Sequence, residues 1–181
     1  MNTKTILGVS FTAIFAVSMM AYAFAFPSWT SVTDFNTGSV GNHTVLQLTT
    51  GGNIPHRADS FVTSNAVVGF AWADLDTAKL VVATIHPILG RDSHQNPDAW
   101  HIHTATLIAG VNGHPFCLAS VDSTPEAGIS INKNSMTVRL NSANLPYAIG
   151  DIDAAVGFTL NGEPACPAVP GLGFGVGVDL T

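Results

Sequence analysis

The stretch DAWHIHTATLIAGVNGHPF, residues 98–116, carries the pattern that decides the fold. Successive side chains of a β-strand point to opposite faces, so His101 and His103 share one face of the run. Asn112 and Gly113 follow this run, and Asn-Gly is typical of the type I′ turn that joins two antiparallel strands. The stretch therefore predicts a β-hairpin that bears two histidines on one face.

The sequence beyond residue 26 also has the pattern of β-strands. Short runs rich in β-branched and aromatic residues recur, and groups of Gly, Pro, Asn, Asp and Ser separate them. Outside the first 25 residues, no 3.6-residue period of useful length indicates a helix. We therefore predict an all-β fold, a single antiparallel β-sandwich with Greek-key connections. The predicted strands lie in segments 44–50, 65–76, 78–88, 99–108, 115–122, 128–132, 136–141, 154–161 and 172–180.

Length and composition indicate one domain with a proper core, since the chain has 181 residues of which 46% are hydrophobic. Charged residues make up only 10%, and the formal net charge is −6. Phosphate groups and anionic lipid surfaces repel such a chain. This balance argues against nucleic acid as a partner.

The N-terminal segment resembles a secretory signal peptide. Lys4 gives it a positive start, an apolar run follows, and Ala23-Phe24-Ala25 fits the small-x-small cleavage pattern. The alternative is an uncleaved anchor, because the run from Ile6 to Phe26 is long enough to cross a bilayer. Either way the remainder is expected to be secreted or otherwise extracytoplasmic, with membrane contact only through an uncleaved N-terminal segment.

This reading divides the chain into three parts. Residues 1–25 are the signal segment, residues 26–43 an irregular lead-in that includes an edge strand, and residues 44–181 the β-domain. Outside the cytoplasm, a lone pair of cysteines more often forms a disulfide than a metal or redox couple. We therefore predict a disulfide between Cys117 and Cys166, with two buried free thiols as the alternative.

A third histidine can join the His-x-His pair. If the loop at residues 89–98 closes the strands on either side symmetrically, His86 lies directly opposite His101. Regular pairing of the next hairpin would place Asp122 beside His103, as a fourth ligand or as the acceptor that orients its ring. These four residues are our predicted site for copper or zinc. The alternative is a pair of solvated histidines with no ion.

The predicted site lies on the outward face, because Trp100 and Ile102 are the better core residues of that strand. His114 is not expected to belong to it, since regular strand geometry separates it from His103 by roughly 27 Å. His94 and Asp92, in the loop above, could reach the site. The sequence does not place His43 or His56.

Part of the chain resembles a known domain family. Residues 67–121 resemble the CHRD (chordin-type) domain in a Leu-Asp turn at residues 75–76, the His-Ile-His run at residues 101–103 and a Gly-x-Asn-Gly turn at residues 110–113. The resemblance implies a small β-sandwich, more distantly similar to copper/zinc superoxide dismutase. The C-terminal half departs from the family pattern, because no histidine follows His114 and only Gly162-Glu163 remains of the closing motif.

Two classes of function follow from this sequence. The first, which the sequence favours, is a binding or structural module at the cell surface, with an extracellular protein or surface component as its partner. The second is an extracytoplasmic protein whose copper or zinc serves storage, delivery or redox chemistry. No nucleophile elbow of an acyl-transfer enzyme is present, so the sequence predicts no catalytic residues.

Overall fold

The computed structural model describes residues 26–64, 67–86 and 99–181, and the predicted signal segment lies outside them. Ten strands and a few short helical turns make up this part of the chain. The strands are β1 (Val32–Val40), β2 (His43–Thr50), β3 (Val67–Asp74), β4 (Lys79–Ile85), β5 (His101–Ala109), β6 (Phe116–Ser123), β7 (Ala127–Asn132), β8 (Ser135–Asn141), β9 (Ala154–Gly162) and β10 (Val176–Leu180). The helical elements are η1 (Ser28–Thr30), α2 (Ser60–Ser64), η3 (Ser142–Asn144) and η4 (Ile149–Asp151). No helix in the described ranges is long and apolar enough to cross a membrane.

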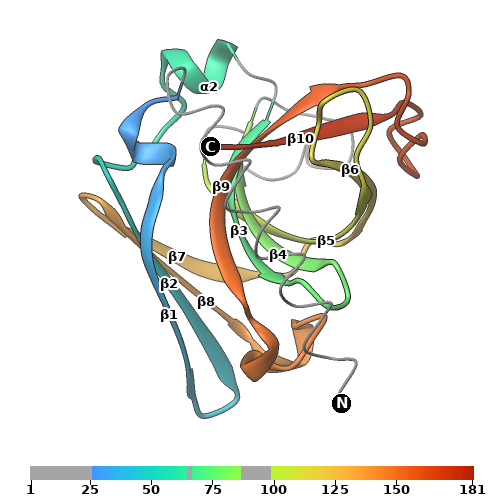
Figure 1. The fold of residues 1–181 in the computed structure, drawn as a ribbon. Helices are drawn as coiled ribbons and strands as arrows, with labels where there is room; N and C mark the ends of the chain where they lie inside the picture. The colour runs from blue at the N-terminus through green and yellow to red at the C-terminus, as the bar shows by residue number, and fades with distance from the viewer. Residues whose placement is uncertain (1–25, 65–66, 87–98) are drawn as a thin grey trace, which may run out of the picture.

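The strands form two antiparallel sheets that lie side by side (Figure 1). One is a four-stranded sheet in the order β1-β2-β8-β7. The other closes on itself as a six-stranded barrel in the order β10-β6-β5-β4-β3-β9. The all-β prediction is therefore confirmed, and closure of one sheet into a barrel is a feature that the sequence analysis did not predict.

Because the barrel closes, the strands that pack against the four-stranded sheet have two buried faces. In β4, Val81 and Ala83 pack in a core against the four-stranded sheet, whereas Leu80 and Val82 face the barrel interior. Every residue of β3 is buried, as expected for a strand covered on both sides. The protein thus has one core between its sheets and a second core inside the barrel.

All nine predicted segments contain a strand. The predicted lead-in is more regular than expected, because β1 pairs with β2 along nearly its whole length as an edge strand of the four-stranded sheet. The sheet therefore begins before residue 44. The five-residue helix α2 was not predicted, because a single helical turn has no detectable period.

Two local predictions are confirmed. Asn112 and Gly113 both have positive φ angles, of 52° and 91°, as a type I′ turn requires. Cys117 and Cys166 form a disulfide with their Cα atoms 5.7 Å apart. This bond ties the loop between β9 and β10 to β6, and an intramolecular disulfide indicates an oxidising compartment.

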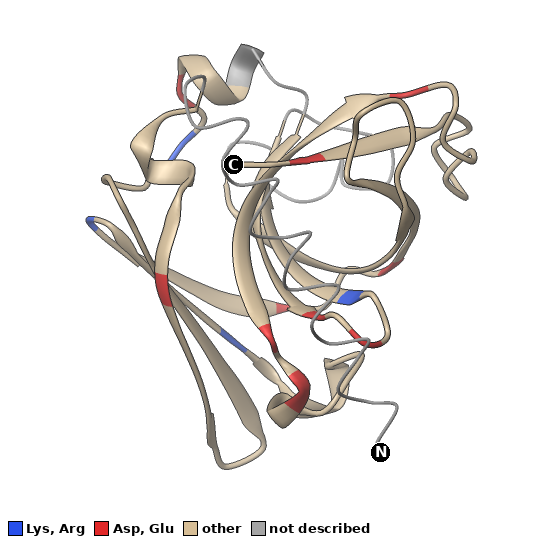
Figure 2. Cartoon of the chain, viewed as in Figure 1, with Lys and Arg blue, Asp and Glu red and all other residues tan. Residues whose placement is uncertain are grey.

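Charged side chains are few and scattered over the described residues (Figure 2). The Lys and Arg residues of this part lie on separate elements rather than in a patch: Arg57, Lys79, Lys133 and Arg139.

Candidate metal centre

Three histidines meet at one end of β4 and β5. The Nε2 atoms of His86 and His101 lie 2.9 Å apart. The ring of His103 is 4.8 Å from that of His101 and 6.2 Å from that of His86, measured between centroids. One ring nitrogen from each histidine lies within 4.8 Å of the other two, so the cluster can hold a metal ion.

The cluster forms although the predicted register is wrong. Thr84, rather than His86, lies opposite His101, and Val82 lies opposite His103. The difference is two residues, and a shift of two keeps every side chain on its face. His86 therefore extends past the end of β4 on the same face as His101 and reaches it diagonally.

The three rings are buried, which corrects the prediction that they face outward. His86, His101 and His103 are only 4%, 8% and 7% exposed. Trp100 and Ile102 do pack in the core between the sheets, as predicted. The histidine face is covered as well, because the barrel closes over it and its neighbours on that face line the barrel interior.

Asp122 does not join the cluster. Near the turn the hairpin follows the predicted register, with Ile108 opposite Cys117, but two shifts follow and leave Thr104 opposite Ser123. Asp122 falls between the paired residues, and its carboxylate accepts a 2.9 Å hydrogen bond from the Thr106 hydroxyl. Thr106 and His103 have opposite parity on β5, so the carboxylate lies on the opposite face from the histidines.

Hydrogen bonds to the second ring nitrogens orient two of the rings. Nδ1 of His101 lies 3.1 Å from the Ala99 carbonyl oxygen, which can only accept, so this nitrogen carries the proton. The Nε2 atom of neutral His101 then presents a lone pair, and the Thr84 hydroxyl lies 3.4 Å from it. Nδ1 of His103 lies 3.0 Å from the Thr124 hydroxyl. Such outer contacts fix ring orientation in metal sites.

Sequence reasoning missed both threonines. The parity of β4 was sufficient to find Thr84, which is two residues before His86 and therefore on its face. Nothing in the sequence indicated Thr124, because its position beside His103 depends on the two register shifts in the hairpin.

The geometry suits an ion with nitrogen ligands. Zinc binds histidine nitrogen at about 2.0–2.1 Å, so two tetrahedral ligands lie roughly 3.3 Å apart. The separations in the cluster, from 2.9 Å up to at most 4.8 Å, bracket this value. Three imidazoles also leave a fourth position for water or another ligand.

The remaining histidines lie elsewhere. His114 contacts carboxylates at the other end of the hairpin: Asp179, at 2.8 Å from Nδ1, and Glu163, at 3.5 Å from Nε2. Hydrogen bonding, first of all from the Ala165 amide, lowers the pKa of Glu163. His43 begins β2 and His56 is exposed, whereas His94 and Asp92 lie outside the described residues.

No family model, curated protein or solved structure matches the chain. The candidate centre is therefore argued from its own geometry.

Proposed function

We propose that this protein binds one zinc or copper(II) ion through His86, His101 and His103, and that this ion is the basis of its function outside the cytoplasm. The observation that carries the proposal is the convergence of three buried imidazole nitrogens within 4.8 Å. Imidazole is a favoured ligand of both ions.

Burial strengthens this proposal relative to solvated histidines. Polar groups inside a protein need partners, and three imidazoles in one apolar barrel are costly unless their nitrogens are satisfied. Among the described residues every buried side-chain nitrogen and oxygen has a hydrogen-bond partner, and one ion would engage all three rings at once. The hydrogen bonds of His101 to Ala99 and of His103 to Thr124 would hold two rings ready for it.

Two features support an extracytoplasmic role. The disulfide persists best in an oxidising compartment, and the N-terminal 25 residues resemble a signal peptide. The CHRD resemblance stays a prediction, as does a role as a cell-surface binding or structural module. In a cell-surface module the same ion would have a structural role.

Metal analysis tests the proposal. Protein purified without a histidine tag is stripped with a chelator, reconstituted separately with zinc and copper(II), freed of excess ion and analysed by mass spectrometry. We expect one equivalent of at least one ion in the wild type. His114→Ala should retain that equivalent, because His114 lies with Asp179 and Glu163 outside the cluster. Failure of the wild type to retain either ion would overturn the proposal.

A further inference from the structure

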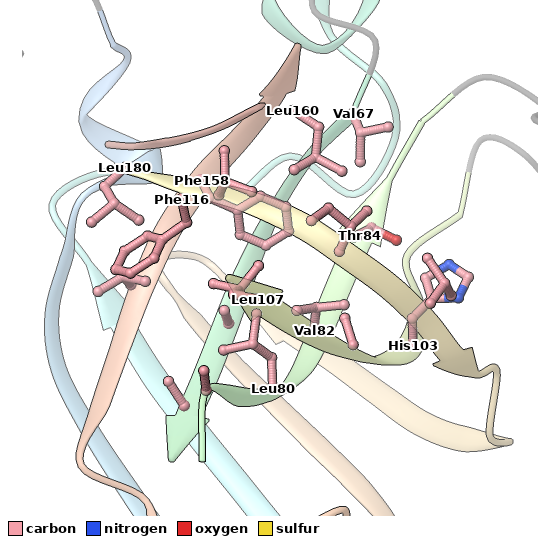
Figure 3. Close-up of a pocket in the computed structure, with 18 of the residues that line it drawn as sticks. Val67, Leu80, Val82, Thr84, His103, Leu107, Phe116, Phe158, Leu160 and Leu180 are labelled. Atoms are coloured by element: carbon pink, nitrogen blue, oxygen red, sulfur yellow. The ribbon is translucent and has the colours of Figure 1, made fainter. Parts of the chain in front are cut away.

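The barrel interior contains a cavity of about 160 Å³ next to the histidines. In Figure 3, the side chains of Phe116 and Leu180 lie at one side of the cavity, and those of Thr84 and His103 lie at the other. From this arrangement we infer that the barrel binds a small, mostly apolar molecule with a single hydroxyl group, the apolar part filling the barrel and the hydroxyl facing His103.

The size of the cavity sets the size of the molecule. An engineered apolar cavity of about 150 Å³ in another protein binds benzene or xenon. A cavity of about 160 Å³ therefore accommodates a single six-membered ring. Small residues create the space, since Ala71, Ala73 and Ala105 all line the cavity where larger side chains would fill it.

The lining sets the polarity of the molecule. Most of the cavity wall is aliphatic or aromatic, and a site of this kind favours apolar ligands held by a few polar contacts. The polar exceptions are Asp74, whose carboxylate accepts hydrogen bonds from Asp76 and Thr77, and, beside the cluster, Thr84, His86, His103 and Thr124. A hydroxyl both donates and accepts, so it can pair with a threonine hydroxyl or with an imidazole nitrogen. A carboxylate would instead have to shed its hydration inside a mostly apolar barrel, which has a large desolvation cost.

The cavity wall reaches the protein surface at two places. Thr124, which contacts His103, is exposed, and so are Pro170, Gly171 and Leu172 of the loop between β9 and β10. Leu172 is 37% exposed although it also lines the cavity. The disulfide at Cys166 anchors this loop to β6, so the wall near the opening is covalently fixed.

The experiment uses phenol and benzene as probes. The protein is metal-free, so the result does not depend on the outcome of the metal analysis. Each probe is titrated into ¹⁵N-labelled protein, and amide shifts of cavity-lining residues are followed. We expect saturable binding of both probes, with phenol about 3- to 10-fold tighter because of one additional hydrogen bond. His103→Phe keeps a ring but removes its nitrogens, so it should eliminate this preference while benzene still binds.

The second part of the experiment fills the cavity with larger side chains. Ala105→Leu should weaken both probes at least tenfold, whereas Thr106→Leu places the same side chain on the outer face of β5 and should change neither affinity. Ala71→Val, a smaller addition from β3, should weaken both probes if Ala105→Leu does not fold. Absence of probe binding to the wild type would overturn the inference. Unchanged binding in the filled variants, or an undiminished phenol preference in His103→Phe, would do so as well.

Discussion

Nε2 of His86 lies 2.9 Å from Nε2 of His101, although the two residues are 15 positions apart and are not opposed across the β4–β5 ladder. The contact is diagonal, since Thr84 is the residue opposite His101. Residues an even number of positions apart on a strand share a face, so His103, two residues after His101, also lies near the pair. The cluster thus depends on face parity more than on an exact pairing.

His101→Ala should remove metal binding, because His101 lies between the other two rings. Its ring centroid is 4.6 Å from that of His86 and 4.8 Å from that of His103. Since the ring is buried, we also expect a loss of about 1–3 kcal/mol in the free energy of unfolding of the metal-free protein. Calorimetric titration with zinc and copper(II) measures the affinity, and denaturant unfolding measures the stability.

His114→Ala is the matched control for this variant. It also removes a histidine with close hydrogen-bond partners, but at the other end of the β5–β6 hairpin. Excess metal should raise the melting temperature of the wild type and of His114→Ala, since an ion that binds only the folded state stabilises it. An equal rise in His101→Ala would place the ion elsewhere.

Ala105→Leu and Ala83→Leu should have opposite effects on stability. Ala105 lines the barrel cavity, so the larger side chain fills space, and we expect between no change and about 1 kcal/mol of added stability. Ala83 is fully buried in the core between the sheets, where overpacking should cost about 1–3 kcal/mol. Urea unfolding of both variants checks this prediction. A comparable loss in both would mean that the barrel has no usable space.

Tyr147→Phe should destabilise the protein by about 1–3 kcal/mol, because two backbone groups lose a hydrogen-bond partner. The Tyr147 hydroxyl donates to the Trp72 carbonyl at 2.6 Å and accepts from the Val81 amide at 3.2 Å. Denaturant unfolding near neutral pH measures the loss. A change below about 0.3 kcal/mol would show that water replaces the hydroxyl.

The same tyrosine predicts a dependence on alkaline pH. Burial raises the pKa of Tyr147 well above its ordinary value of 10.0. The folded state therefore keeps the phenol proton at pH values where the unfolded chain releases it. This contribution to stability is fully present below about pH 10 and declines as the pH rises above that value. Wild-type stability should fall more steeply than that of Tyr147→Phe between pH 9 and 11.5, as unfolding curves at each pH would show.

Replacing both Cys117 and Cys166 with alanine should lower the free energy of unfolding by about 4 kcal/mol on the chain-entropy account, since the bond closes a loop across a sequence separation of 49. Thermal unfolding of the double variant measures the loss. The unreduced wild type should show no reactive thiol after denaturation. Two thiols per chain in that titration would contradict the disulfide.

The sequence alone determined the strands and much of the local geometry. The apolar and β-branched runs predicted segments that each contain a strand, and Asn112-Gly113 predicted the turn with its positive φ angles. The common face of His101 and His103 also follows from the sequence, because side-chain alternation has a period of two and needs no partner strand. The Cys117–Cys166 bond followed from the cysteine count together with the predicted export of the chain.

Tertiary structure decided the rest, because pairing register and sheet closure depend on residues far apart in sequence. The β4–β5 register shifted by two residues and kept the histidines together, whereas the irregularities in the β5–β6 hairpin carried Asp122 to the opposite face and placed Thr124 beside His103. Closure of the barrel then buried a face that the sequence predicted to be exposed. Local alternation shows which residues share a face, but only the packing of distant strands determines whether that face meets water or lines a cavity.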